Sequence, residues 1–261
     1  MPSDNTIEPT ATITYKTNPA PLEFDLYSPN VHSDTPGALI FYYHPGATYL
    51  GSRKLGFPAW LRDGCNKRGW TICSVDYRLL PESSIADIME DLKDMWTYVH
   101  RRLNTELQQR SLTLVDLDAV FVSGGSAGGY ITFQAGHLLS PRPAGLLAMY
   151  GDCFIGDWYA KAHSADAIIS NVRLGDVEKY STEIEQYFQG GRSPSQVGLS
   201  RTGPIPTRSM FYHYLIRKGE CLYNELYLLE GKDHFWDLGE EDDVLKVKAK
   251  IWTFLDKIAS H

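Results

Sequence analysis

A serine near the middle of the chain lies in a run of small residues, Gly124-Gly125-Ser126-Ala127-Gly128. An apolar stretch typical of a buried strand, residues 119–122, precedes it, and a helical pattern over residues 127–139 follows it. A serine on such a strand-to-helix turn is held in a strained backbone conformation that exposes its hydroxyl, and the turn leaves room only for small neighbours. The pattern predicts Ser126 as an acyl-transfer nucleophile, with the backbone N–H of Ala127 as an oxyanion donor.

A second short motif, His44-Pro45-Gly46-Ala47, ends in two small residues and follows another apolar stretch at residues 38–43. An acyl-transfer intermediate needs donors fixed where its oxygen becomes anionic, and backbone N–H groups of small residues serve this purpose. Pro45 has no N–H. We therefore expect Gly46 and Ala47 to complete an oxyanion hole with Ala127.

The candidate general base is His234, which follows an apolar run at residues 226–229 predicted to be the last strand. Histidine suits this role because its unperturbed pKa lies near neutrality. Three further histidines fall in predicted helices and are expected to be packing or surface residues: His100, His137 and His213.

The third member of a catalytic triad is less well defined. The order serine, acid, histidine places the acid between Ser126 and His234. Asp152 follows a predicted strand at residues 145–149 and is our first candidate, with Asp157 and Glu220 as alternatives. A site without an acid also stays open, because a serine–histidine pair retains part of the chemistry.

These residues require a sheet that brings strand ends together. Apolar runs at residues 38–43, 70–75 and 119–122 alternate with helical patterns such as residues 85–103, which predicts an α/β fold with a mainly parallel sheet flanked by helices. Further elements are expected as two antiparallel strands at residues 12–16 and 22–27 and a closing helix at residues 244–258. We predict one domain over residues 1–261, with a small helical lid at about 157–208.

Three motifs occur together in order: His44-Pro45-Gly46-Ala47 with Gly51-Ser52, then Asp76-Tyr77-Arg78-Leu79-Leu80-Pro81-Glu82, then Gly125-Ser126-Ala127-Gly128-Gly129. The set resembles the hormone-sensitive-lipase-like branch of the α/β hydrolases, whose usual forms are HGGG, DYRLAPE and GDSAGG. The resemblance implies an α/β-hydrolase fold and cofactor-free hydrolysis of carboxylic esters by a Ser-His-Asp triad. It also assigns His44 to the oxyanion loop and places His234 where the family has its catalytic histidine. The region that bears the acid in the family is altered or shortened here.

Composition narrows the function classes. The formal net charge is −7, with 43% hydrophobic and 22% charged residues, which argues against a nucleic-acid-binding face. We expect a cytoplasmic protein, because the start lacks the blocks of a secretory signal and no apolar run could span a bilayer. Four cysteines without paired spacing and the lack of a dinucleotide fingerprint predict neither metal nor cofactor. A homodimer is possible.

Three functions remain. The first is a serine hydrolase of a carboxylic ester, thioester or lactone. The second is a non-hydrolytic cyclase, lyase or isomerase that uses His234 and Ser126 for acid–base catalysis on a polyketide-like carbonyl compound of secondary metabolism. The third is a non-catalytic ligand receptor. The substrate is expected to be a hydrophobic small molecule bound by His44, Trp158 and Tyr159. For the second function, further aromatic residues in and near the lid would suit a large apolar substrate, and the alternative is that they belong to the core: Phe154, Phe211, Tyr212 and Tyr214.

Overall fold

The structure is a computed structural model that describes residues 8–151, 181–189 and 242–260. The predicted strand at residues 226–229 and most of the predicted lid lie outside the described residues. Within the lid region, one helix is described, α8 (Ser181–Gln189).

A six-stranded sheet forms the centre of the described part, in the order β1-β2-β4-β3-β5-β6. Its strands are β1 (Ala11–Lys16), β2 (Leu22–Tyr27), β3 (Gly37–Tyr43), β4 (Thr71–Val75), β5 (Val115–Gly125) and β6 (Gly145–Met149). β4, β3, β5 and β6 run parallel, whereas β1 and β2 pair antiparallel and β2 joins β4 antiparallel. The predicted α/β class and the antiparallel N-terminal strands are confirmed.

The central strands are mostly apolar because both of their faces are covered. β3 and β5 pair in parallel, with Tyr43 opposite Gly124, so the two strands end side by side. The carboxyl ends of parallel strands in such a sheet are where ligands bind. The predicted oxyanion loop and the predicted nucleophile follow these two ends.

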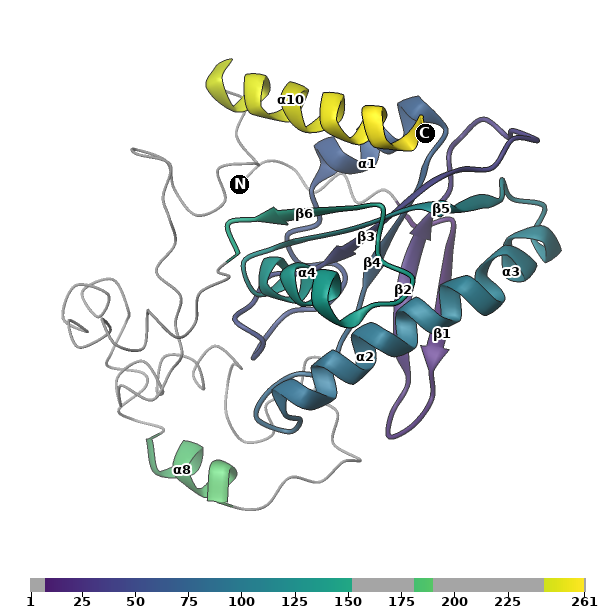
Figure 1. Cartoon of the computed structure of the whole chain (residues 1–261). Coiled ribbons are helices and arrows are strands. Elements are labelled where there is room, and N and C mark those ends of the chain that lie inside the picture. The colour runs from purple at the N-terminus through teal and green to yellow at the C-terminus, as the bar shows by residue number, and fades with distance from the viewer. Residues whose placement is uncertain (1–7, 152–180, 190–241, 261) are drawn as a thin grey trace.

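Helices cover the two faces of the sheet (Figure 1). α1 (Ala59–Arg68) and α10 (Asp242–Ala259) lie on one face, and α2 (Ile85–Tyr98), α3 (Asn104–Gln109) and α4 (Ala127–Leu138) lie on the other. Each face has its own buried core: Ile88 of α2 and Ile131 of α4 belong to one, and Leu61 of α1 and Leu255 of α10 to the other. The turn between β5 and α4, where Ser126 lies, is thus held by a packed layer on each side of the sheet.

Two details differ from the sequence prediction. The helix expected over residues 85–103 begins at a capping box on Ser84 but passes into a π-helical turn, Val99–Leu103, before α3. The sequence pattern does not predict α1, because few of its residues face the core: Leu61, Gly64 and Cys65. Its apolar spacing is therefore weak, and contacts with α10 help to hold it: a Cβ on Gly64 would lie 1.9 Å from the Trp252 ring.

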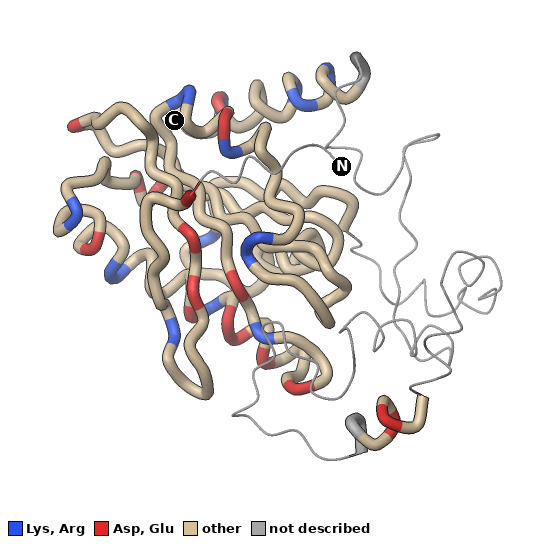
Figure 2. Tube along the Cα trace, turned by 180° about the vertical axis from the view of Figure 1, so that it is seen from behind, with Lys and Arg blue, Asp and Glu red and all other residues tan. Residues whose placement is uncertain are grey.

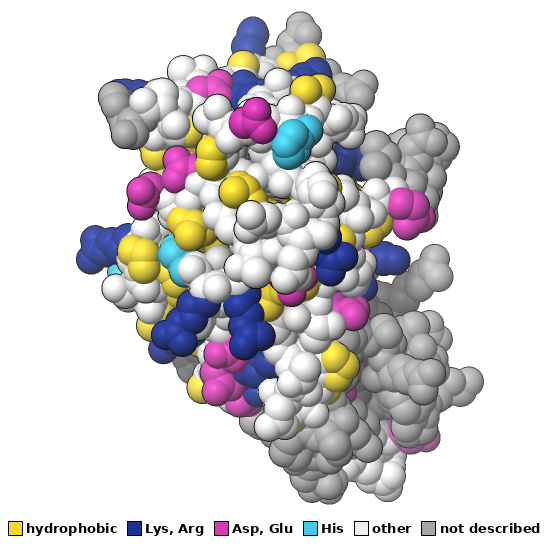
Figure 3. All heavy atoms as spheres, turned by 90° about the vertical axis from the view of Figure 1, so that its right-hand side faces the viewer, with side chains coloured by type: hydrophobic (Ala, Val, Ile, Leu, Met, Phe, Trp, Pro, Cys, Tyr) yellow, Lys and Arg dark blue, Asp and Glu magenta, His cyan; other side chains and the backbone are white. Residues whose placement is uncertain are grey.

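The charged residues are interspersed over the described trace (Figure 2). On the face in Figure 3, groups of basic side chains lie beside acidic ones, with single hydrophobic side chains between them. In the described ranges, no helix combines the length and the apolar character needed to cross a bilayer.

Candidate active site

Ser126 occupies a strained turn between β5 and α4. Its backbone angles are φ 53° and ψ −117°, a region that residues with a side chain rarely adopt. The turn is fixed on both sides, because the Ser126 N–H donates to the Met149 carbonyl at 3.0 Å and its carbonyl accepts from the Tyr130 N–H at 3.1 Å. Ser126 is half-buried while Gly125 and Ala127 beside it are buried. This is the geometry expected of a nucleophile elbow.

The glycines around Ser126 are required by close backbone contacts. A Cβ on Gly128 would lie 1.9 Å from the Tyr43 carbonyl oxygen, and one on Gly124 would lie 2.3 Å from the Gly128 carbonyl oxygen. The first turn of α4 therefore packs directly against the end of β3. This contact places the predicted nucleophile next to the start of the loop that follows β3.

Gly125 stands where the resembling family has aspartate, and the structure supplies a reason. A Cβ at this position would lie 2.4 Å from the Tyr150 hydroxyl oxygen. The phenol of Tyr150 thus fills the space next to the elbow that a side chain at position 125 would need. Tyr150 itself has a positive φ of 40°, so this strand end is also strained.

The loop of residues 44–52, which we call the oxyanion loop, contains a run of left-handed backbone conformations. The φ angles are 126° at Gly46, 52° at Ala47, 63° at Thr48 and 104° at Gly51. The Gly46 carbonyl accepts from the N–H of Leu50, whereas within the described part of the chain the N–H groups of Gly46 and Ala47 donate to no backbone carbonyl. Both residues are half-buried, so their N–H groups are candidates for oxyanion donors.

His44 is buried under this loop. Its ring is 0% exposed and stacks on Tyr77 with ring centroids 4.2 Å apart. Nδ1 lies 2.7 Å from the Pro45 carbonyl oxygen and must carry the proton to donate to it, which leaves Nε2 as an acceptor without a hydrogen-bond partner among the described residues. Burial lowers the pKa of His44 to about 4, although the bond to Pro45 opposes the shift. His44 is therefore neutral at pH 7.

The segment after β4, residues 76–83, supports the oxyanion loop from the side. The Tyr77 hydroxyl donates to the His44 carbonyl at 2.8 Å, and the Leu80 N–H donates to the Thr48 carbonyl at 2.8 Å. Because strained residues persist only where the surroundings over-determine them, these bonds help to maintain the loop.

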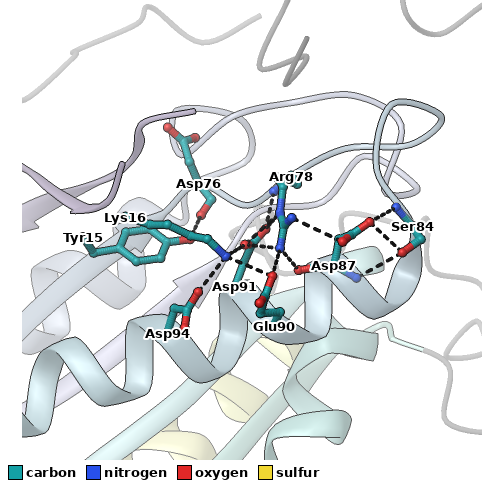
Figure 4. Close-up of polar contacts among 9 residues, drawn as sticks. All are labelled: Tyr15, Lys16, Asp76, Arg78, Ser84, Asp87, Glu90, Asp91 and Asp94. Carbon is teal, nitrogen blue, oxygen red and sulfur yellow. Dashed lines mark hydrogen bonds and ion pairs between the residues drawn. The ribbon is translucent and has the colours of Figure 1, made fainter. Parts of the chain in front are cut away.

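That segment is in turn fixed to α2 by an ionic cluster around the buried Asp91 (Figure 4). Asp91, whose side chain is 0% exposed, accepts from the backbone N–H and the guanidinium of Arg78 and from the Lys16 ammonium at 2.9 Å. The carboxylates of Glu90, Asp91 and Asp94 lie within 4.8 Å of one another, close enough to hold a metal ion. Lys16 forms ion pairs with all three, so the cations of this cluster are the protein's own.

The structure thus brings together Ser126, Ala127 and the loop bearing Gly46 and Ala47. The predicted contact of His44 with a substrate stays a prediction, since the described contacts of its ring are with Tyr77 and the loop. The remaining predicted site residues lie outside the described residues: His234, Asp152, Asp157, Glu220, Trp158 and Tyr159.

Sequence reasoning missed the residues that support the site. Arg78 and Tyr77 were noted only as parts of a motif, and Asp91 and Lys16 were not singled out. Their signal was available in part, because a charged residue in an otherwise apolar pattern is a candidate for a buried pair. Which charges pair could not be read from the spacing, since Lys16 and Asp91 are 75 positions apart.

Comparisons with known proteins agree with this fold. Residues 40–191, more than half of the chain, match the α/β-hydrolase-fold family. The protein of unknown function from Staphylococcus aureus has a TM-score of 0.63 at 17% identity, with 95% of this chain and 98% of that chain covered, which supports the fold. The chain belongs to the α/β-hydrolase-fold family, in its hormone-sensitive-lipase-like branch.

Two curated relatives are similar over part of the chain. The non-reducing polyketide synthase Preu6 of Preussia isomera is 31% identical over 145 residues, which are 53% of this chain and 6% of that protein. The "Probable carboxylesterase M8" of a Phoma species is 30% identical over 107 residues, which are 40% of this chain and 33% of that protein. The chain therefore matches a third or less of the length of these relatives.

Proposed function

We propose that this protein is a serine hydrolase that cleaves a carboxylic ester, thioester or lactone. The observation that carries the proposal is the strained Ser126, at φ 53°, at the start of a helix whose Gly128 packs against the end of β3. The loop that begins there carries Gly46 and Ala47, whose N–H groups donate to no backbone carbonyl among the described residues. Similarity to a relative named as a carboxylesterase supports the same reaction class.

In this mechanism the Ser126 hydroxyl attacks the acyl carbon while His234 takes its proton. The carbonyl oxygen becomes anionic and accepts from the N–H groups of Gly46, Ala47 and Ala127. Collapse of the intermediate breaks the bond to the leaving alcohol, thiol or lactone oxygen, which receives the proton from the histidine. Water then attacks the acyl-enzyme, with the same histidine as base, and releases the acid.

His234 and Asp152 complete the proposal as base and acid. The proposed substrate is a small hydrophobic compound, in line with the aromatic residues of the lid region, including Trp158 and Tyr159. No metal or organic cofactor has a step in this mechanism.

The test is hydrolysis of a p-nitrophenyl ester series from acetate to octanoate by the full chain. Ser126→Ala and His234→Ala should each lower kcat by at least about 10³-fold. Ser123→Ala is the matched control: this serine precedes the elbow on the same strand, and its hydroxyl donates to the Phe41 carbonyl at 2.6 Å. Activity retained in Ser126→Ala, or lost equally in the control, would contradict the proposed nucleophile.

Similarity to a polyketide synthase gives one specific reason to retain a second candidate, acid–base cyclisation, elimination or isomerisation of a polyketide-like carbonyl compound. Here His234 and Ser126 would move protons without an acyl-enzyme. Mass spectrometry distinguishes the two reactions, because hydrolysis adds the mass of water and leaves a transient acyl adduct on Ser126. A cyclisation that proceeds without that adduct would favour the second candidate.

A further inference from the structure

Arg53 follows the oxyanion loop directly and is held by carboxylates from β2 and from the residue after β4. Its guanidinium forms ion pairs with Asp25 of β2 at 2.8 Å, with Glu23 of β2 at 3.1 Å and with Asp76, the residue after β4. Both aspartate side chains are 1% exposed, whereas Glu23 is 36% exposed. One guanidinium thus balances the charge of two buried carboxylates. Its contact with Asp25 is an ion pair, because Nε has no hydrogen-bond partner among the described residues.

The main chain of Arg53 is fixed as firmly as its side chain. The Arg53 N–H donates to Asp76 Oδ1 at 2.6 Å, and its carbonyl accepts from the Ser74 hydroxyl. The oxyanion loop therefore has two fixed ends: the end of β3 before His44, and Arg53. The strained residues Gly46, Ala47 and Thr48 lie between these ends.

The buried carboxylates depend on Arg53 for their charge balance. Burial raises the pKa of Asp76, and Arg53 opposes that shift by ion pairing and hydrogen bonding. Asp25 has one further donor, the Thr12 hydroxyl at 2.6 Å, and its Oδ2 has no hydrogen-bond partner among the described residues. Removal of the guanidinium would leave two buried carboxylates without their shared cation, and the segment around Arg53 would have to move to let in water or protons.

We propose that Arg53 is a positioning residue: clamped between Asp25 and Asp76, it fixes the far end of the oxyanion loop and thereby holds the N–H groups of Gly46 and Ala47 in place. Arg53 acts through the loop and does not itself contact the substrate. The inference rests on the proposed hydrolase function for its catalytic consequence, whereas the anchoring of the loop stands on the contacts alone.

Two measurements on Arg53→Met test the proposal. The first is kcat and KM for p-nitrophenyl butyrate. Oxyanion donors act mainly on the transition state, and small misplacements of such groups cost up to about 10²-fold. We expect kcat to fall by about 10- to 100-fold, with KM changed by less than about threefold. The second is amide hydrogen exchange, which should accelerate in residues 44–56 while residues 119–138 keep their protection.

Arg62→Met is the matched control, because this arginine is equally covered, with a side chain 15% exposed against 16% for Arg53, and pairs with Asp63 on α1. It should leave kcat and the exchange of residues 44–56 unchanged. If Arg53→Met fails to fold, Arg53→Lys tests the same claim, since an ammonium keeps the charge but lacks the planar fork that reaches three carboxylates. Arg53→Lys should also lower kcat.

The outcomes separate the two proposals. Wild-type kcat in a folded Arg53 variant, wild-type exchange of residues 44–56, or faster exchange throughout the chain would each overturn the positioning role. A wild-type protein that hydrolyses no ester, combined with faster exchange confined to residues 44–56 in Arg53→Met, would overturn the hydrolase function and leave the anchoring of the loop intact.

Discussion

Burial of a neutral histidine should make the stability of this protein depend on pH in a definable window. His44 is 0% exposed, and burial lowers its pKa from the ordinary value of about 6.5 to about 4. Between these values the unfolded chain binds a proton that the folded protein does not. The stability that comes from keeping His44 neutral should therefore be fully present above pH 6.5. The free energy of unfolding should fall as the pH is lowered toward 4.

The size of the effect follows from the shift. Each pKa unit corresponds to about 1.4 kcal/mol, so a shift of about 2.5 units amounts to roughly 3 kcal/mol between pH 6.5 and pH 4. Total stabilities of domains are usually about 5–15 kcal/mol, which makes a loss of this size readily measurable.

Urea unfolding of wild type and His44→Asn at pH values from 7 to 4 measures this contribution. Asparagine cannot titrate, and its amide nitrogen can occupy the place of Nδ1 and donate to the Pro45 carbonyl. The variant should lose about 3 kcal/mol less than wild type over the range, whatever its stability at pH 7. Equal pH dependence of the two proteins, or an NMR titration of His44 with a midpoint near 6.5, would refute the reasoning from burial.

Three further predictions concern the elbow and the ionic cluster. Ser126→Gly should raise the free energy of unfolding by about 1 kcal/mol, because relief of backbone strain exceeds the entropy cost of glycine; a loss of stability in urea unfolding would contradict this. Gly128→Ala should destabilise the protein by at least about 2 kcal/mol, since the new Cβ meets the Tyr43 carbonyl. Gly136→Ala in the same helix meets only the flexible end of a leucine and should be tolerated. Equal losses of thermal stability in the two variants would contradict this prediction. Asp91→Asn should cost about 3 kcal/mol by removing the buried charge that its cationic partners share, and a change below 1 kcal/mol in urea unfolding would show that the cluster contributes little.

Local patterns were sufficient for much of the fold. The strands β3, β4 and β6 and the helix α4 agree with the apolar runs and periodicity of the sequence to within a residue. The elbow followed from Ser126 and its glycines because strand, turn and helix are contiguous, and a tight turn accepts few residue types. The π-helical turn at Val99–Leu103 was not foreseen, because its spacing of apolar residues matches an ordinary helix.

The sequence by itself determined the short motifs that predict which backbone N–H groups stabilise an oxyanion: those of Gly46, Ala47 and Ala127. Only the tertiary structure decided what holds them. The protonation state of His44 depends on its enclosure beneath the loop. The position of Arg53 depends on carboxylates 23 to 30 residues away, on β2 and just after β4. Charge pairing and burial arise from residues brought together by the sheet, and their free energies depend on distance and dielectric environment rather than on sequence spacing.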